Sequence, residues 1–547
     1  MAGVMGSAQA QSIQAVLVVH RVFNRGPVDA ENVTLHTVLP ASNRYQDIVA
    51  MKVLPEPASK HDDGEGQQIA RIPLGTIPRG EHRSAFLLVW MRPKEFKGRL
   101  VPARDRVEPL ADAVRAGYLT SGWPLEVDKV RPIALGVIEG KPRDLDKARA
   151  LYDHMARHCK YNIDGAVDAA DVVLAGKPAS CSELAYTFVA LCRSVEIPAR
   201  VVSGYVRRDG GSARVDWLTH RWAEFFADGL GWVPVDPTHR LNRSPKENFF
   251  GRQDGKYLAL LDDGVELEPG PDPGWRTVEV SAERGNRGLT VDRYGVWSVS
   301  RKRADEEQFF VRAVDGLNLA DPAERLEAIE GWKRSRRPLS LVFWLEALLD
   351  RDATIRRLAA EQIGGYAEPT ALMGLMGQIK IEPDFPVVEA LTASARRILG
   401  TKNTARRAIA VQELCKSRAD QALELLDDVW LDKDREVRKA AANMLYKFGD
   451  KPKVHEAYRA MARDDDDFVR ILAALRWSRI GSHRALEHLA GHLESKLAWD
   501  RRKALAVLVE RTKDTFGFNA GEKPTTRDNR EAIERFNAWL DDHPEAK

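Results

Sequence analysis

A periodic pattern in the C-terminal half constrains the fold of this chain more than any other feature of its sequence. Arginines and alanines recur there at one constant interval: Arg406, Arg438, Arg470 and Arg502, with Ala410, Ala442, Ala474 and Ala506. The same interval separates Arg325 from Arg357 and Ala328 from Ala360 in an earlier register. A period of about 32 residues fits one pair of helices per unit, so we expect a helical solenoid over residues 318–515.

The local sequence of each repeat agrees with this prediction. An acidic residue that can cap a helix precedes a stripe of small residues in the segments 352–360, 434–441 and 467–474. The region resembles HEAT-like repeats of the short type, whose long surfaces usually bind another protein. We interpret the arginine column as structural pairing between helices, with contact to a partner as the alternative. The phase slips near residues 383–399, and residues 516–547 read as a loop followed by a terminal helix.

The N-terminal part has a different character. Segments rich in β-branched and apolar residues lie at 12–23, 33–39, 68–74 and 84–90, with turn-rich segments between them. This pattern predicts a β-sandwich domain over residues 12–108 with a structural or binding role. We expect a mixed α and β core over residues 109–300 and a linker over 301–317.

Composition excludes several classes of protein. The 547 residues are 44% hydrophobic and 30% charged, which excludes a disordered chain. Lys and Arg total 83 against 80 Asp and Glu, so we do not expect a nucleic-acid partner. No apolar stretch is long enough to predict an integral membrane segment. Ala8-Gln9-Ala10 resembles the end of a signal peptide, so residues 1–11 are either a flexible tail or a signal-peptide remnant. The first would leave the protein cytoplasmic and the second would place it in the periplasm or outside the cell.

The four cysteines are few enough to consider one by one. Cys159, Cys181, Cys192 and Cys415 cannot form a disulfide framework, and no metal-ligand cluster is visible, so we expect no metal or cofactor. Cys181 follows Ser180, a predicted N-cap, and opens an amphipathic helix. The helix dipole and the free N–H groups of that first turn stabilise a thiolate, the reactive form of the side chain. The other three cysteines have only packing roles.

Two further residues complete a candidate catalytic set. His220 and Asp236 lie on the two arms of a predicted hairpin around Asp228-Gly229. A three-residue loop centred on Asp228 would pair them directly, whereas a two-residue turn would shift the register by one. Direct pairing would bring the imidazole within hydrogen-bonding distance of the carboxylate. The set then has a nucleophile in Cys181, a general base in His220, and Asp236 to orient the imidazole.

The surrounding motifs resemble the transglutaminase-like superfamily, whose core has a papain-like arrangement. The matching segments are Cys181-Ser-Glu, Ile197-Pro-Ala-Arg200 with Gly204-Tyr205, His220-x-Trp222-Ala-Glu224, and Gly231-Trp232-Val-Pro-Val-Asp236-Pro-Thr238. The order Cys, His, Asp also matches, while Ala179 replaces a glycine that is common two residues before the cysteine. The N-terminal β-domain looks like one that precedes this core in some bacterial members. We interpret Trp222 and Trp232 as core or pocket walls and Glu224 as a structural partner.

The resemblance implies a multidomain protein with a β-sandwich, an α+β papain-like transglutaminase core and an α-solenoid. It also implies cysteine-dependent acyl transfer on a protein or peptide amide, as a protease or amidase if water accepts the acyl group and as a transglutaminase if an amine does. The repeats would recruit a protein partner or substrate. The alternative is a catalytically inactive scaffold that binds partners through the solenoid and the β-domain.

Overall fold

A computed structural model describes residues 12–62, 67–97, 100, 109–163, 167–207, 214–238, 249–262, 278–300, 302–334, 338–427 and 429–543. The chain divides into two compact units, Met1–Val314 and Asp315–Lys547. The predicted tail or signal-peptide remnant at residues 1–11 lies outside the described residues. Within these ranges, the structure contains no helix with the length and apolar character needed to span a membrane.

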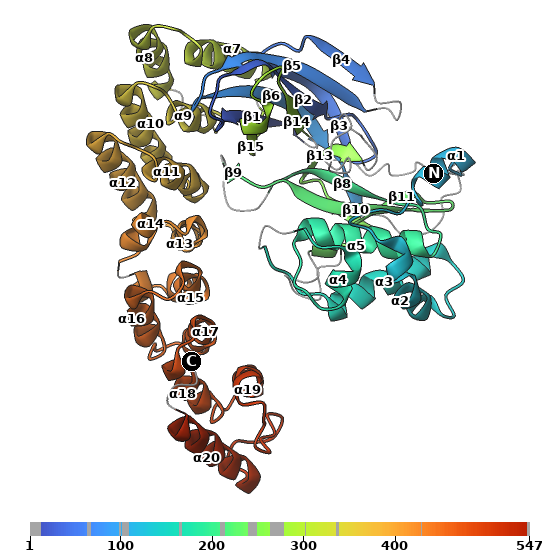
Figure 1. Ribbon diagram of the computed structural model, residues 1–547, viewed down its shortest axis with the longest axis vertical. Coiled ribbons are helices and arrows are strands. Elements are labelled where there is room, and N and C mark those ends of the chain that lie inside the picture. The colour runs from blue at the N-terminus through green and yellow to red at the C-terminus, as the bar shows by residue number, and fades with distance from the viewer. Residues whose placement is uncertain are drawn as a thin grey trace, which may run out of the picture. The chain divides into compact units, whose positions relative to one another are not determined.

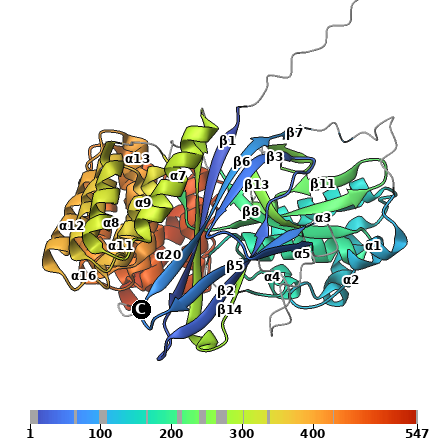
Figure 2. The ribbon, with the colours of Figure 1, turned by 90° about the horizontal axis from the view of Figure 1, so that it is seen from above.

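Two antiparallel sheets form the strand-rich part of the first unit. One has the strand order β3-β6-β1-β15-β9 and the other β14-β2-β5-β4. Figure 2 shows β2, β5 and β14 side by side in the second sheet. The bounds are β1 Gln14–Asn24, β2 Ala30–Leu39, β3 Gln46–Leu54, β4 Ser59–Asp62, β5 Gln68–Ile77, β6 His82–Pro93, β9 Val215–Asp216, β14 Val278–Ser281 and β15 Leu289–Val299. A separate pair joins β7 Glu95–Lys97 to β12 Arg252–Asp254.

The central strand β1 shows why these residues form a sandwich. Val16, Val18 and Val22 alternate along it and pack with Leu35 and Ile72 of the facing sheet in one buried cluster. The sandwich includes more than the range predicted for it, because β14 and β15 come from the range predicted as the catalytic core. β15 pairs with β1 along its whole length, from Gln14 opposite Val299 to Asn24 opposite Leu289.

The segment expected as a linker, residues 301–317, contains a helix. Helix α7 (Arg303–Leu317) begins directly after β15. The ring centroids of Phe310 and of Phe86 on β6 lie 6.4 Å apart. Glu306 accepts a hydrogen bond of 3.0 Å from the indole N–H of Trp90. The helix therefore covers apolar side chains of the five-stranded sheet instead of spacing two domains.

The rest of the first unit is a mixed core. Its sheet has the order β11-β10-β8-β13, and Figure 1 shows helices α2 to α5 gathered on one side of it. Leu184, Phe188 and Leu191 of the predicted amphipathic helix are fully buried there. The bounds are β8 Ala199–Val206, β10 His220–Ala227, β11 Gly231–Val235, β13 Tyr257–Asp262, α1 Asp112–Gly117, α2 Val127–Ile138, α3 Asp144–His158, α4 Ala170–Leu174 and α5 Cys181–Ser194.

The core and the sandwich share buried side chains. Tyr205 of β8 and Leu258 and Leu260 of β13 belong to the same apolar cluster as the sandwich strands. Gly295 of β15 lies so close to Tyr205 that a Cβ at this glycine would meet the tyrosine ring at 2.8 Å. The two parts predicted as separate domains therefore form one compact unit.

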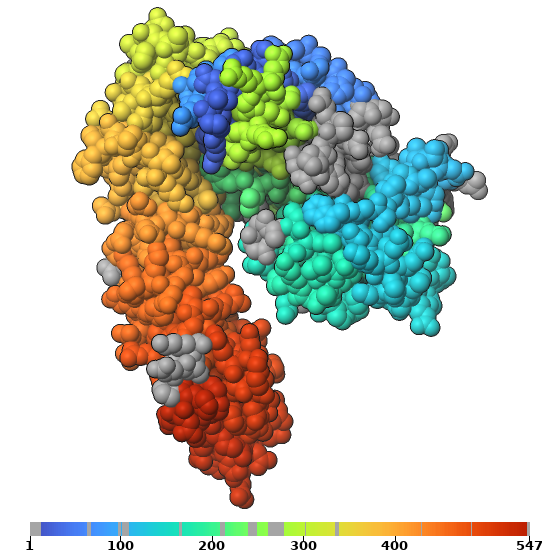
Figure 3. Space-filling model, in the orientation of Figure 1, coloured from blue at the N-terminus to red at the C-terminus, as the bar shows by residue number. Residues whose placement is uncertain are grey.

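The second unit consists of stacked helices, drawn from yellow-green to red in Figure 3. Consecutive helices pack through small and branched residues, among them the predicted column members Ala410, Ala442 and Ala474, which are fully buried. Ala506 is exposed and Ala504 takes the buried position. The bounds are α8 Pro322–Glu330, α9 Ser340–Ala347, α10 Ala353–Tyr366, α11 Leu372–Ile379, α12 Phe385–Leu399, α13 Thr404–Ser417, α14 Asp420–Leu425, α15 Arg435–Met444, α16 Pro452–Met461, α17 Asp467–Trp477, α18 His483–His492, α19 Ala498–Thr512 and α20 Arg527–Asp542.

Two arginines of the predicted column pair neighbouring units, as we interpreted the column. Arg325 and Arg438 each bind a carboxylate of the following unit, Asp350 and Asp464 respectively. Other units use the neighbour of the predicted arginine: Arg356 instead of Arg357, Arg407 instead of Arg406, and Arg501 instead of Arg502. The interval between equivalent arginines is therefore not constant. A fixed period of 32 residues could not identify the correct arginine in every unit.

Candidate active site

Cys181 is the first residue of α5, as predicted, and the turn before it is held by a buried carboxylate. Glu183 is completely buried, and its side chain accepts the backbone N–H of Ser180 at 2.7 Å and that of Asp168 at 3.0 Å. Ser180 is the N-cap and forms a capping box with Glu183. This box fixes the start of the helix, so the thiol lies at the positive end of the helix dipole.

His220 is the first residue of β10, and it forms a short hydrogen bond with Asp236. The distance from His220 Nε2 to Asp236 Oδ2 is 2.7 Å, and both side chains are buried. Asp236 also accepts the hydroxyl of Tyr257 at 3.2 Å and the backbone N–H of Thr238 at 3.0 Å. Three donors therefore surround one buried carboxylate, which compensates for its loss of hydration.

The hairpin register that we predicted for this pair is wrong. Strand β10 pairs with β11 so that Ala227 lies opposite Gly231, and this register leads to Thr238, not Asp236, opposite His220. The loop has three residues but centres on Gly229, whose φ of 74° lies in the left-handed region that glycine adopts readily. The shift is two residues, and side chains on a strand alternate with a period of two. Asp236 therefore stays on the face of His220 as its diagonal neighbour.

The thiol of Cys181 lies beside the imidazole. Burial disfavours its ionised form, but the hydrogen bond with His220, the charge of that ring and the backbone N–H of Arg221 outweigh burial and lower the pKa of Cys181 from 9.0 to about 7. For His220, burial disfavours the charged ring, while Asp236 and Cys181 favour it and raise the pKa from 6.5 to about 10. The structure thus brings together the three predicted residues, in an arrangement that stabilises a thiolate–imidazolium pair.

The other three cysteines differ from Cys181 in environment. All three are buried and free, and burial raises the thiol pKa in each. Cys192 and Cys415 are completely enclosed. The interpretation of these three as packing residues agrees with the structure.

Two residues of the site were not predicted from the sequence. Tyr257 reaches Asp236 from β13, which forms the opposite side of the sheet from β11. Arg221 contributes its backbone N–H to Cys181, and its guanidinium binds the hydroxyls of Ser182 at 2.7 Å and Ser203 at 3.1 Å. Arg221 could have been suspected because it follows His220 directly. Tyr257 carries no local signal, because only the strand order brings it near.

The residues interpreted as structural fill those roles. Glu224 accepts two hydrogen bonds from Arg200, at 2.9 and 2.7 Å, and the guanidinium lies 4.1 Å from the ring of Trp232. Trp222 is buried against Tyr257, with ring centroids 5.0 Å apart. Both tryptophans therefore serve as walls around the strands that carry the site.

Comparison with known families agrees with this geometry. Residues 131–237, which include all three residues of the candidate set, match the transglutaminase-like superfamily. The core is a transglutaminase-like domain. Residues 394–476 match HEAT repeats, so the transglutaminase-like core is followed by a HEAT-repeat region in one chain. Both matches fall inside the ranges predicted for the core and the solenoid.

Solved structures give weaker likenesses. A structure named "Putative Cysteine Protease" from Cytophaga hutchinsonii is 15% identical, covers 53% of this chain and 92% of its own, and has a TM-score of 0.37. The complex of CpcE and CpcF of phycocyanin lyase from Nostoc sp. is 19% identical over 41% of this chain and 92% of its own, with a TM-score of 0.17. No curated protein matches the chain. The assignment of the transglutaminase-like domain therefore rests on the family match.

Proposed function

We propose that the protein is a cysteine-dependent acyl-transfer enzyme that acts on amides of proteins or peptides. In this proposal Cys181 is the nucleophile, His220 the general acid and base, and Asp236 the residue that orients the imidazole. The observation that carries it is the series of hydrogen bonds from the Cys181 thiol through His220 to Asp236, in which the thiol pKa is lowered and the imidazole pKa is raised.

The chemistry follows from these positions. The thiolate attacks the carbonyl carbon of the amide, and the backbone N–H of Cys181 at the helix start can donate to the developing oxyanion. Because Nε2 of His220 is engaged by Asp236, its Nδ1 faces the thiolate and gives its proton to the departing nitrogen. The C–N bond breaks, ammonia or an amine leaves, and a thioester remains on Cys181.

The second half of the reaction determines the class of enzyme. Neutral His220 removes a proton from the attacking molecule, which is water in a protease or amidase and an amine in a transglutaminase. The same three residues serve both, so the acceptor that reaches the thioester decides between them. The family match supports the common first step and both continuations.

The HEAT repeats support a role in recruitment. Such repeats typically bind proteins along an extended surface, and one chain carries both the repeats and the candidate active site. We propose that the repeats hold a protein partner or substrate for the core.

The test is to trap the acyl-enzyme. We expect intact-mass spectrometry of the full chain, incubated with reduced casein or a native lysate, to detect a thioester adduct on Cys181. Cys181→Ala should abolish the adduct, and Cys192→Ala, which removes a buried thiol of the same helix, should retain it if the variant folds. Added dansylcadaverine separates the two continuations, because its incorporation into casein indicates an amine acceptor, whereas shortened or deamidated casein indicates water.

The same experiment tests the scaffold alternative. If neither the wild type nor Cys192→Ala forms an adduct, and Cys181 reacts with iodoacetamide like an ordinary thiol with a pKa near about 8.5, the enzyme proposal fails. The solenoid and the β-domain would then be the functional parts.

A further inference from the structure

Arg221, the residue after His220 on β10, contacts two consecutive residues at the start of α5. Its backbone N–H donates to the thiol of Cys181, and its Nη1 donates to the hydroxyl of Ser182 at 2.7 Å. The main chain and the side chain of one strand residue therefore both reach the first turn of the helix. These bonds place the turn that carries the thiol against the strand that begins with His220.

The same guanidinium also binds the neighbouring strand. Arg221 lies directly opposite Ser203 of β8 in the sheet, and its Nε donates to the Ser203 hydroxyl at 3.1 Å. Ser203 is buried, so this part of the guanidinium has a fixed anchor. With Nε bound to β8 and Nη1 bound to α5, the planar guanidinium joins a strand to a helix through two hydroxyls.

An aromatic ring supports the guanidinium one turn further along α5. The guanidinium carbon of Arg221 lies 5.7 Å from the centre of the Tyr186 ring, within the range of a cation–π contact. Tyr186 follows Ser182 by four residues, so both side chains lie on the same face of the helix. Arg221 therefore covers one face of the first two turns of α5.

The first turn of α5 is attached to the sheet differently from the later turns. The later turns are buried against apolar side chains, and the ring centroids of Phe188 and Phe225 of β10 lie 6.3 Å apart. Cys181 and Ser182 are only half-buried, so apolar packing contributes less to their position. The polar contacts of Arg221 thus act where the apolar packing of the helix ends.

The capping box at the helix start does not replace this attachment. Glu183 accepts the backbone N–H groups of Ser180 and Asp168, so it joins the first turn to the chain that precedes the helix. Both donors precede α5, and neither lies on β10. The box shapes the turn, whereas the distance from Cys181 to His220 depends on what joins that turn to the sheet.

We propose that Arg221 is a positioning residue, which holds the first turn of α5 against β10 and β8 and so keeps the thiol of Cys181 beside the imidazole of His220. This inference rests on the proposed function, because the contact that Arg221 maintains is the one that forms the thiolate–imidazolium pair. Hydrogen bonds weaken steeply with distance and angle, so a small displacement of the turn should reduce thiolate formation. The side chain of Arg221 acts through Ser182 and takes no part in bond making or breaking.

The pH dependence of Cys181 alkylation in the full-length chain tests the proposal without requiring acyl transfer. Iodoacetamide labels the thiolate, and the midpoint in the wild type should lie at about pH 7. Ser182→Ala removes the hydroxyl on α5 and leaves every charge in place. We expect it to raise the midpoint by about one pH unit, so labelling should slow about fivefold at pH 7 and match the wild type at about pH 9.5. Ser182→Thr keeps a hydroxyl and should restore the wild-type midpoint.

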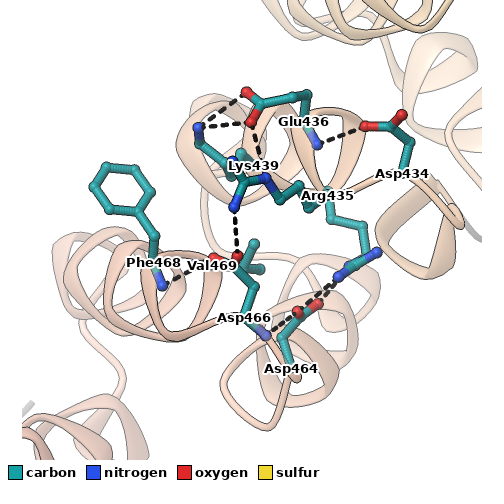
Figure 4. A network of polar contacts seen from close by, with 9 residues as sticks. Asp434, Arg435, Glu436, Lys439, Asp464, Asp466, Phe468 and Val469 are labelled. Carbon is teal, nitrogen blue, oxygen red and sulfur yellow. Dashed lines mark hydrogen bonds and ion pairs between the residues drawn. The ribbon is translucent and has the colours of Figure 1, made fainter.

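Replacement of the arginine separates its geometry from its charge. Arg221→Lys keeps the positive charge, but an ammonium cannot reproduce the fork that binds both hydroxyls, so the midpoint should rise as it does in Ser182→Ala. Arg221→Met removes the charge as well and should raise the midpoint at least as far. Arg435→Met is the matched control, because Arg435 also joins two elements, through a contact of 3.4 Å with Asp466 in the second compact unit (Figure 4). This variant should be labelled as the wild type is.

The outcomes separate this inference from the proposed function. A wild-type midpoint near about 8.5 or higher would contradict the activation of Cys181 and so overturn both. A wild-type midpoint near about 7 that stays unchanged in Ser182→Ala and Arg221→Lys would overturn the positioning role alone. A lower melting temperature with an unchanged midpoint would do the same, because it would show that Arg221 only stabilises the fold. Full labelling of Arg221→Lys beside slow labelling of Arg221→Met would assign the effect to charge and also overturn it.

Discussion

The core and the solenoid both shelter pairs of opposite charge, but they use different chemical groups. In the solenoid, Arg438 binds Asp464 through two hydrogen bonds of 2.6 and 2.9 Å, and this bonding raises the arginine pKa further. In the core, Cys181 and His220 become a charged pair only when a proton moves from sulfur to nitrogen. The first pair is permanently ionised at any physiological pH, and the second forms within a limited pH range.

This difference separates an ion pair that supports structure from one suited to chemistry. A guanidinium and a carboxylate do not exchange a proton near neutral pH, so their attraction holds one helical unit against the next and takes no part in proton transfer. A thiol and an imidazole can exchange one, because their pKa values lie near the working pH and respond to small changes in surroundings. Four predictions test this contrast.

The largest effect is expected from His220→Gln. Without the imidazole, burial of Cys181 is no longer outweighed, and its pKa should rise above the ordinary 9.0. At pH 7 the thiolate fraction falls from about one half to below about one hundredth, so iodoacetamide labelling should slow by roughly 50-fold or more. Tandem mass spectrometry at fixed times gives the rate for the Cys181 peptide. An unchanged rate would mean that His220 does not activate the thiol.

The next largest effect should appear in the solenoid on replacing Asp464 with asparagine. The change leaves Arg438 part-buried with a neutral partner, which should cost about 2 kcal/mol of local stability, roughly 30-fold in the opening equilibrium. Hydrogen exchange of the α15 and α17 amides measures it. Asp465→Asn is the matched control, because Asp465 is the exposed neighbour. If both variants exchange alike, the ion pair between Arg438 and Asp464 does not hold the two units together. Labelling of Cys181 should be unaffected in either case.

The third prediction is that pH changes the labelling rate of Cys181 by about tenfold and leaves the ion pairs of the solenoid unchanged. Since the Cys181 pKa is lowered to about 7, the thiolate forms as pH rises through 7, and labelling should increase about tenfold from pH 6 to pH 8. Since the His220 pKa is raised to about 10, the imidazolium persists to that pH, and acyl transfer should decline above it. Hydrogen exchange in the solenoid should stay protected over pH 6–8 after correction for intrinsic exchange rates. A labelling midpoint at 8.5 or higher would contradict the proposed activation.

The smallest effect is expected from Tyr257→Phe. This change removes one donor from Asp236 but keeps the bond of 2.7 Å to His220, so acyl-enzyme formation should fall by about two- to threefold. With one donor fewer, the Asp236 carboxylate should stabilise the charged imidazole of His220 more strongly and raise its pKa. The decline of acyl transfer at high pH should therefore move to a higher pH. Tyr186→Phe, on the α5 side of Arg221, is a comparison that leaves Asp236 untouched. A loss as large as that of His220→Gln would indicate a direct role for Tyr257 in the reaction.

The structure brings the three candidate residues together although one step of the prediction, the register of the hairpin, was wrong. Ser180 and Glu183 carry their capping signal within four residues, so the start of α5 and the place of Cys181 could be predicted locally. His220 and Asp236 are hydrogen-bonded although the predicted register was wrong by two residues, since only an odd shift moves a side chain to the other face. Tyr257 could not be predicted, because its place depends on β13 pairing with β8.

The solenoid gives a similar lesson about periodicity. The constant interval predicted helix pairs correctly, and family comparison confirms HEAT repeats at residues 394–476. It selected Arg406 and Arg502 where the structural role belongs to Arg407 and Arg501. Packing, not numbering, sets which side of a helix faces the next unit. An average period can therefore identify the architecture and still miss a buried arginine by one residue.

The pairing of β1 with β15 has a consequence for how the chain can be made. Gln14 of β1 lies opposite Val299 of β15. The central strand of the larger sheet therefore cannot pair with β15 until the ribosome has synthesised nearly all of the first compact unit. Until then β1 has β6 on one side and an open edge on the other, the kind of edge that templates wrong pairing. A fragment ending before Leu289 would keep this edge permanently. Synthesis of the whole transglutaminase-like core must therefore precede closure of the sandwich into which the first strand folds.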